Sequence, residues 1–335
     1  MKYLWKRKKQ VRHNSVVTRV KRASRLGQFF RRGLGGFLLL LAIGVAAIGG
    51  VEAWRSKLSG DGRFTIVITS PSMAIFSYQP QTAEGVLLKI PDAFMLAASH
   101  GYGKWRVVAV AGLDTQEGFS GKLVRDSATR TFGVVVDGQL KATRALEIGE
   151  REDLRSLVLS ALWQKFTGGV ETNLSLWDLV RLTRILSTTR IDRIKAVSLD
   201  EVTRLLAVAE PDGGVVYTLD EGALADLSRQ WFTDENVAKE NVTVIVVNEA
   251  QVAGLGTTIA RVLSIAGVNV VAVENGEGVR EKSGVYAHGK LKKSKSLAVI
   301  KKLMPEIEAL DLGEGERGDI ILRLGKDVGK RFGGN

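Results

Sequence analysis

Few side chains in this sequence have the chemistry or the spacing of a known catalytic set. The 335 residues include no cysteine, so thiolate chemistry and disulfides are excluded. His100 and His288 each stand beside a glycine with no second ligand at metal spacing, which predicts surface histidines. Gly254 and Gly256 could offer backbone amides to an anion, but the third glycine of a dinucleotide-binding fingerprint is missing. No Ser-His-Asp set can be identified, so residue types alone do not predict an enzyme.

An uncharged run of nineteen residues, 33–51, determines where the rest of the chain must lie. Ten of these residues are Leu, Ile, Val or Phe. As a helix the run would span roughly 28 Å, close to the ~30 Å hydrocarbon core of a bilayer. Insertion would be favoured by roughly 3 to 6 kcal/mol before the glycines are discounted. We therefore predict a transmembrane helix over residues 33–53, with a buried core helix as the alternative.

The flanking charges predict how this helix is oriented. Residues 1–32 carry twelve Lys or Arg and no Asp or Glu. By the positive-inside rule the N-terminus is cytoplasmic and the bulk of the chain is extracytoplasmic, as in a single-pass protein of the cell membrane. A cleaved signal peptide is the competing interpretation, because Val51 and Ala53 precede Trp54 at suitable spacing. The apolar run is nevertheless longer than the usual 7 to 15 residues of a signal peptide.

The basic arm, residues 1–32, is predicted to bind the inner surface of the bilayer. Val16, Val20, Ala23 and Phe30 recur at near-helical spacing among basic residues, as in an amphipathic helix that lies on lipid. Nucleic acid could use the same charges and is the less favoured partner. Beyond residue 32, 36 Lys or Arg balance 36 Asp or Glu, so the net charge of +12 belongs to the arm. The membrane-binding candidates are Lys6, Arg7, Lys8, Lys9, Lys21, Arg22, Arg25, Arg31 and Arg32.

After a polar linker, 54–63, residues 64–235 have the pattern of an α/β domain. FTIVIT, MAIFSY and GVLLKI are β-type segments separated by Ser-Pro and Gln-Pro breaks. We also predict short helices over 93–99 and 105–112, a strand over 132–136 and a hairpin over 205–219.

Helical patterns occupy much of the same domain. Apolar spacing predicts helices over 152–166 and 221–232. Ser175 stands three residues before Asp178, which is the signature of a capping box and predicts a helix over 176–186. The residues expected to be buried on that helix are Leu179, Val180, Leu182 and Ile185.

Residues 241–328 predict a second, smaller α+β domain. VTVIVV is a β-branched strand, followed by a helix that ends at Gly267 and by a second strand, VNVVAV. A strand over 279–286, a helix stopped at Pro305 and a last strand over 319–324 complete the domain. The order strand, helix, strand, strand, helix, strand predicts a split βαβ, or ferredoxin-like, sandwich.

This C-terminal stretch resembles a known family. VTVIVVNEAQVAGLGTTIARVLSIAGVNVVAVEN, GVYAHGK, SKSLAVIKKL and DIILRLGKD are similar to the C-terminal domain of LytR-CpsA-Psr envelope proteins. The shared features are the strand ending in Asn248, Gly254 before the helix, Gly267 before the second strand, and Leu324-Gly325 near the end. MAIFSYQPQTAEGVLLKIPD, GYGKWR and VETNLSLWDLVRL resemble parts of the catalytic domain of that family.

The resemblance implies phosphotransfer chemistry, from which the sequence departs. Active members of the family move a glycan phosphate from a polyprenyl-pyrophosphate carrier to the cell wall, using carboxylates that hold Mg²⁺ and arginines that clamp the pyrophosphate. Asp92 matches a family carboxylate without its neighbouring arginine, and Lys104 and Arg106 match a basic position. These three are candidates for residual phosphate or metal contacts. From residue 64 to residue 92 only Glu84, Lys89 and Asp92 are charged, which makes a Mg²⁺ site there improbable.

Two further departures point the same way. Arg151, Asp153 and Arg155 could be remnants of the family's later arginine-rich motif, but their spacing is tighter and fits a solvated helix face. Residues 135–144 are also too short for the family's central insertion. We therefore expect a shortened and inactive relative of the catalytic domain.

The functional hypothesis is a membrane-anchored envelope protein that binds or scaffolds without turnover and without a cofactor. Its expected partners are the bilayer and wall glycan or envelope proteins. The small residues Ala42, Ala46 and Gly50 could also pack against a second copy, with ordinary transmembrane composition as the alternative explanation of this stripe. The alternative is an active phosphotransferase that uses Mg²⁺ to attach glycopolymers to the wall. A third hypothesis is a regulator whose basic arm senses membrane or nucleic acid.

Overall fold

The structure is a computed structural model that describes Gly50 and residues 56–58, 62–70, 72–141, 151–210, 213–313 and 316–333. The chain divides into two units, Met1–Arg55 and Ser56–Asn335, and all the elements named below belong to the second. The basic arm and, apart from Gly50, the predicted transmembrane helix lie outside the described residues. Among the residues that are described, no helix combines the length and the apolar character needed to cross a bilayer.

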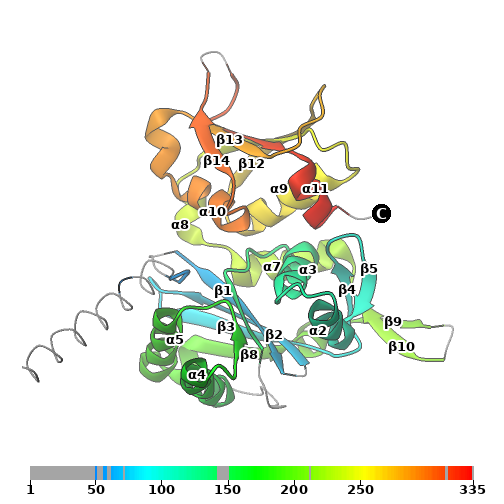
Figure 1. Cartoon of the computed structure of the whole chain (residues 1–335), viewed down its shortest axis with the longest axis vertical. Coiled ribbons are helices and arrows are strands. Elements are labelled where there is room, and N and C mark those ends of the chain that lie inside the picture. Colours follow the sequence, from blue (N-terminus) through cyan, green and yellow to red (C-terminus); the bar gives the residue numbers. More distant parts are fainter. Residues whose placement is uncertain are drawn as a thin grey trace, which may run out of the picture. The chain divides into compact units, whose positions relative to one another are not determined.

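A six-stranded mixed sheet organises the first part of this unit (Figure 1). Strands β1 and β2 pair antiparallel, with Phe64 opposite Tyr78, while β6 joins β1 and β8 joins β3 in parallel. The side chains of β2 after its first residue are all buried, because helices cover both faces of the sheet. In spatial order the strands are β7 (Glu171–Thr172), β6 (Gly138–Lys141), β1 (Phe64–Ser70), β2 (Ser72–Gln79), β3 (Glu84–Ile90) and β8 (Ile194–Ser198).

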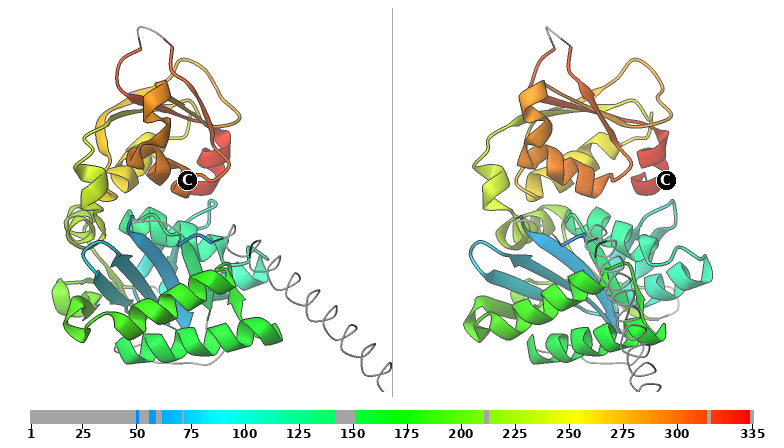
Figure 2. Two further views of the ribbon diagram at one scale, coloured as in Figure 1. Left: turned by 90° about the vertical axis from the view of Figure 1, so that its left-hand side faces the viewer. Right: turned by 60° about the vertical axis from the view of Figure 1, so that its left-hand side comes forward.

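Helices cover the two faces of this sheet as separate layers (Figures 1 and 2). α4 (Arg151–Thr167) and α5 (Leu176–Thr188) bury Leu154 and Leu179 against one face. α2 (Val107–Gln116), α3 (Lys122–Phe132) and α7 (Glu221–Phe232) pack against the other face. The result is a three-layer α/β arrangement, which confirms the mixed α/β class predicted for this region.

The capping box predicted for α5 is present. The Ser175 hydroxyl accepts a hydrogen bond from the Asp178 amide at 3.1 Å, and the Asp178 carboxylate accepts one from the Ser175 amide at 2.9 Å. Leu179 and Leu182 are buried as expected. The prediction that Val180 is buried is wrong, because Val180 faces solvent and is 42% exposed.

Three local predictions in this region are wrong. Residues 93–99 form no helix but contain β4 (Met95–Ala98), whose side chains alternate between half-buried and buried. The segment predicted as a helix over 105–112 starts in β5 (Gly103–Arg106) before α2 begins. Phe132 ends α3 instead of starting a strand, since Gly133 takes a left-handed conformation that terminates the helix. Short apolar runs do not distinguish helix from strand, and these segments are all short.

The predicted hairpin is confirmed and the remaining short elements complete this region. β9 (Leu206–Ala209) and β10 (Val215–Thr218) pair antiparallel, and β4 pairs with β5. The remaining elements are η1 (Ile191–Arg193), α6 (Leu199–Val202), α8 (Glu235–Ala238) and, further along the chain, η2 (Gly289–Lys293).

The C-terminal region is a five-stranded sheet whose topology corrects the ferredoxin-like prediction. β11 and β12, joined by α9, are direct parallel neighbours, whereas a split βαβ unit would place a strand between them. A fifth strand, β14, was not predicted and lies parallel beside β13 at the sheet edge. In spatial order the strands are β12 (Asn269–Asn275), β11 (Thr243–Asn248), β15 (Ile320–Leu324), β13 (Gly284–Ala287) and β14 (Glu308–Asp311).

The helices α9 (Leu255–Ile265), α10 (Lys295–Leu303) and α11 (Lys326–Phe332) cover one face of the five-stranded sheet. α9 also contacts α3 and α7, and α11 contacts α3. Ile265 belongs to the core beneath α3 and α7, and a Cβ on Gly133 would lie 2.3 Å from the Ile265 Cδ1 atom. These helices therefore pack on both the C-terminal sheet and the six-stranded region.

A buried carboxylate joins α3 to α11. Asp126 receives hydrogen bonds from Arg331 Nε at 2.8 Å and Arg331 Nη2 at 2.6 Å, and shares one of 3.0 Å with His100 Nε2. Burial alone would raise the pKa of Asp126, but His100 and Arg331 together hold this pKa below its ordinary value. The ion pair therefore stabilises the ionised carboxylate, and with it the packing of α11 on α3.

We predict that Asp126→Asn lowers the free energy of unfolding by about 3 kcal/mol at neutral pH, because Arg331 loses its buried partner. Since the pKa of Asp126 in the folded state is depressed, the extra stability of the wild type over Asp126→Asn is fully present above the ordinary aspartate pKa. It is lost as pH falls through the depressed value. Denaturant unfolding of the full chain at several pH values, followed by tryptophan fluorescence, measures this difference.

Asp226→Asn is the matched control, since its ion pair with Arg229 is exposed and worth about 0.5 kcal/mol or less. A gap between wild type and Asp126→Asn that stays constant down to strongly acidic pH would contradict the assignment.

Candidate functional site

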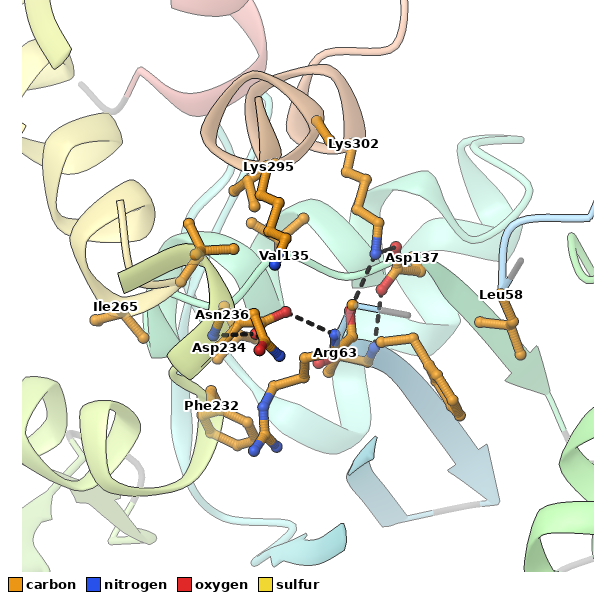
Figure 3. Close-up of a pocket in the computed structure, with 18 of the residues that line it drawn as sticks. Leu58, Arg63, Val135, Asp137, Phe232, Asp234, Asn236, Ile265, Lys295 and Lys302 are labelled. Carbon is orange, nitrogen blue, oxygen red and sulfur yellow. Dashed lines mark hydrogen bonds and ion pairs between the residues drawn. The ribbon is translucent and has the colours of Figure 1, made fainter. Parts of the chain in front are cut away.

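A cavity of about 340 Å³ lies where the six-stranded region meets α10 and the end of α9 (Figure 3). Its walls are largely apolar, and its polar groups come from widely separated parts of the chain. The apolar lining includes Leu58, Phe64, Val134, Val135, Phe232, Val237, Ile265, Ala266, Ala298 and Val299. The charged lining consists of Lys57, Arg63, Asp137, Asp234, Lys295 and Lys302.

One buried ion pair fixes a side of this cavity. Lys302 Nζ lies 3.0 Å from the Asp137 Oδ1 atom and also donates to the Arg63 carbonyl at 3.0 Å. The second Asp137 oxygen accepts from the Thr65 amide at 2.8 Å. Burial raises the pKa of Asp137 above its ordinary value, although Lys302 and the Thr65 amide oppose the shift. The Asp137 side chain is 4% exposed, so its charge is balanced chiefly by Lys302.

A second carboxylate, Asp234, organises the backbone on the opposite side. It accepts from the Arg63 amide at 2.8 Å and from the Asn236 amide at 2.9 Å. The Arg63 guanidinium is committed to protein oxygens, with bonds to the Thr233 and Trp231 carbonyls at 3.1 and 2.9 Å. Burial lowers the pKa of Arg63, and Asp234 is the largest opposing influence. Arg63 therefore holds the junction together and is not placed to bind a ligand.

Lys295 is a lining cation placed to meet a ligand. Figure 3 shows its side chain pointing from α10 into the cavity, while that of Lys302 points to Asp137. Within the described part of the chain, Lys295 makes no ion pair of 4 Å or less. The lining carries four cations against two carboxylates, which leaves two positive charges beside an apolar wall. Such a cavity suits a ligand with an anionic group and an apolar part.

The three candidate phosphate or metal contacts predicted from the sequence do not line the cavity. The predicted membrane-binding residues lie outside the described residues. Asp92 is exposed in the turn before β4. Lys104 is exposed on β5, and Arg106 on the same strand pairs with Glu210. Arg155 is exposed on α4, as a solvated helix face would be.

The described residues do not fit a Mg²⁺ site. Nowhere in residues 56–333 that the structure describes do three or more His, Asp or Glu side chains come together as metal ligands. The carboxylates of the cavity are each engaged by protein donors, Asp137 by Lys302 and Asp234 by the Arg63 amide. We therefore derive no metal-dependent step from this site.

Sequence reasoning missed the cavity residues. Lys295 and Lys302 are seven residues apart, so they lie on the same side of α10, and that spacing was a usable signal. Arg63 was assigned to the linker, and Asp137 followed a strand predicted in the wrong place. No local pattern relates these positions to one another.

Comparisons with known proteins give matches to solved structures only. No model of a known protein family matches the chain, and no curated protein matches it. TagT of Bacillus subtilis aligns with a TM-score of 0.37 and 10% identity, covering 51% of this chain and 90% of TagT. TagV of B. subtilis aligns with a TM-score of 0.37 and 10% identity over 50% of this chain and 95% of TagV. The Lin1025 protein of Listeria innocua gives a TM-score of 0.35 and 10% identity, with coverages of 50% and 95%. Over about half of its length the chain is thus similar in structure to the LytR-CpsA-Psr proteins TagT and TagV.

We predict that Lys302→Met destabilises the chain by about 3 kcal/mol at neutral pH, because Asp137 is left buried without a cation. The pKa of Asp137 is raised in the folded state. The contribution of this carboxyl to the free energy of unfolding is therefore complete below the ordinary aspartate pKa and is lost as pH rises through the raised value. The penalty of Lys302→Met should therefore grow with pH over that interval. Denaturant unfolding of the full chain as a function of pH tests this.

The double variant Lys302→Met with Asp137→Asn should recover most of the lost stability, since the carboxylate that lost its partner is removed as well. Lys301→Met, an exposed neighbour on α10, should change stability by less than about 0.5 kcal/mol. Equal effects at Lys301 and Lys302 would show that the ion pair is not the cause.

Proposed function

We propose that this chain is a membrane-anchored, extracytoplasmic cell-envelope protein of the LytR-CpsA-Psr type that binds a phosphate-bearing amphiphile without turnover. The proposed topology is a single transmembrane helix over residues 33–53, with the N-terminus cytoplasmic and the basic arm on the inner leaflet. The proposed partners are the bilayer and a lipid-linked or wall glycan, and no cofactor is required.

The cavity at the junction of the two regions carries this proposal. Its excess of cations suits a phosphate group, and its apolar wall of Phe64, Val135 and Ile265 suits a hydrocarbon chain. Lys295 supplies a cation that points into the space (Figure 3). The sequence resemblance of both regions to LytR-CpsA-Psr proteins supports the class of ligand.

The positions of the three candidate phosphate or metal contacts support binding over turnover. Arg106 is paired with Glu210, a carboxylate that competes with any phosphate for the guanidinium. Asp92 and Lys104 are exposed and belong to separate elements. A pyrophosphate clamp needs several fixed cations around one point, which these three residues do not provide.

A binding experiment on the full chain in nanodiscs tests the proposal. Polyprenyl phosphate should bind, and Lys295→Gln should weaken binding about tenfold, the loss of one charge-assisted hydrogen bond. Lys301→Gln is the matched control on the same helix and should bind as the wild type does.

Two results would count against the proposal. Equal affinity of wild type and Lys295→Gln would remove the cavity as the binding site. Release of polyprenyl phosphate from a lipid-pyrophosphate glycan in the presence of Mg²⁺ would establish a phosphotransferase in place of a binding module.

A further inference from the structure

The outer surface of helices α4 and α5 carries an unusual concentration of exposed apolar side chains. Trp163 is 73% exposed, which is the largest value for a bulky apolar residue in the described part of the chain. Trp177 is 49% exposed, and Leu159 and Val180 are each 42% exposed. We call these four residues the tryptophan surface.

The four residues share one side of the helix pair. Leu159 and Trp163 are four residues apart on α4, and Trp177 and Val180 are three apart on α5, so each pair lies on one helix face. The opposite faces hold Leu154, Val158, Leu179 and Leu182, which are buried against the sheet. Figure 2 shows the two helices side by side on the outside of the sheet. Their solvent faces therefore form one continuous surface.

The tryptophan surface adjoins the point where the chain enters the folded unit. The Asp178 carboxylate accepts hydrogen bonds from the Ser56 hydroxyl at 2.6 Å and from the Leu58 amide at 3.0 Å. Trp177 is the neighbour of Asp178 in sequence. Lys165 Nζ donates to the Leu174 carbonyl at 2.5 Å, which ties the last turn of α4, beside Trp163, to the start of α5.

The length of the preceding segment places this point near lipid if residues 33–51 span the bilayer. Four residues lie between Val51 and Ser56, and a fully extended chain covers at most about 18 Å over the five Cα-to-Cα steps. Asp178, to which Ser56 is hydrogen-bonded, is then held within reach of the headgroup region. Tryptophan is enriched at that depth because its ring is apolar and its indole N–H is polar.

The charges around the surface favour an anionic headgroup layer. α4 and α5 contain five Lys or Arg against three Asp or Glu, and one of those acids, Asp178, is buried in the capping box. Glu152 and Asp153 lie in the first turn of α4, about 10 Å along the helix from Leu159, the nearest member of the tryptophan surface. Arg155 and Arg184 are exposed. Basic side chains beside apolar ones are the composition of a surface that lies in a lipid–water interface.

We propose that the tryptophan surface docks on the outer leaflet of the bilayer and fixes the orientation of the folded unit above the membrane. This inference rests on the membrane anchor of the proposed function. Docking through Trp163 and Trp177 would leave the junction cavity, which is lined by other elements, open to ligands.

Single-cysteine spin labels on the full chain test the docking, because the sequence has no cysteine of its own. The protein is reconstituted in vesicles of phosphatidylcholine with phosphatidylglycerol. Labels at Leu159→Cys and Val180→Cys should collide with oxygen more than with an aqueous nickel chelate. Labels at Val208→Cys and Val273→Cys, which are 47% and 45% exposed on β9 and β12, should collide more with the chelate.

A second comparison tests the tryptophans themselves. Changing Trp163 and Trp177 to Ala should remove the lipid signature of the Leu159→Cys label, whereas Trp105→Ala, at another exposed tryptophan, should leave it intact. Replacing phosphatidylglycerol by phosphatidylcholine should weaken the signature.

The docking is overturned if the Leu159 and Val180 labels behave like the Val208 label while an Ala42→Cys label reports the bilayer interior. An Ala42 label in water would overturn the anchor as well, and so identifies failure of the proposed topology. Immobilisation of the Leu159 label by soluble wall glycan, with no lipid signature, would assign the surface to glycan instead.

Discussion

The Asp178 carboxylate is the interaction on which much of this structure depends. It is fully buried and serves two segments at once, since it completes the capping box of α5 and binds the backbone of Lys57 and Leu58. Burial alone would raise its pKa, but hydrogen bonds from Ser56, Leu58, Ser175 and Lys57 hold the pKa below its ordinary value. One ionised side chain thus starts a helix and fixes where the chain enters the folded unit. Lys57 and Leu58, which line the cavity, are thereby tied to the start of α5.

The junction cavity exists because the two halves of the unit meet through helices and not through their sheets. α9 packs on α3 and α7 closely enough that Gly133 leaves no room for a side chain beside Ile265. α10 lies further along the same junction, where Lys302 reaches Asp137 and Lys295 points into the remaining space. Asp137 of the first half is balanced by Lys302 of the second. The site is therefore a property of the packed unit and of neither half alone.

The parts that sequence could predict are those with a strong local signal. Ser175 and Asp178 fix the start of α5 through reciprocal hydrogen bonds within four residues. β1 to β3 are largely apolar segments separated by Ser-Pro and Gln-Pro breaks. β4 and α3 were not predicted because their apolar patterns are short or mixed with polar residues. The order of the C-terminal strands depends on which strands pair. β15 lies between β11 and β13, and no residue pattern within β15 predicts these neighbours. The cavity could not be predicted either, because its charged residues come from segments far apart in sequence, such as Arg63 and Lys302.

Because burial raises the pKa of Asp137, the charge of the cavity lining depends on pH. When the carboxyl takes up a proton, one of two negative charges in the lining disappears while all four cations remain. Lys302 then loses its charged partner Asp137 and keeps its hydrogen bond to the Arg63 carbonyl. Protonation of Asp137 would thus make the lining of this cavity more cationic.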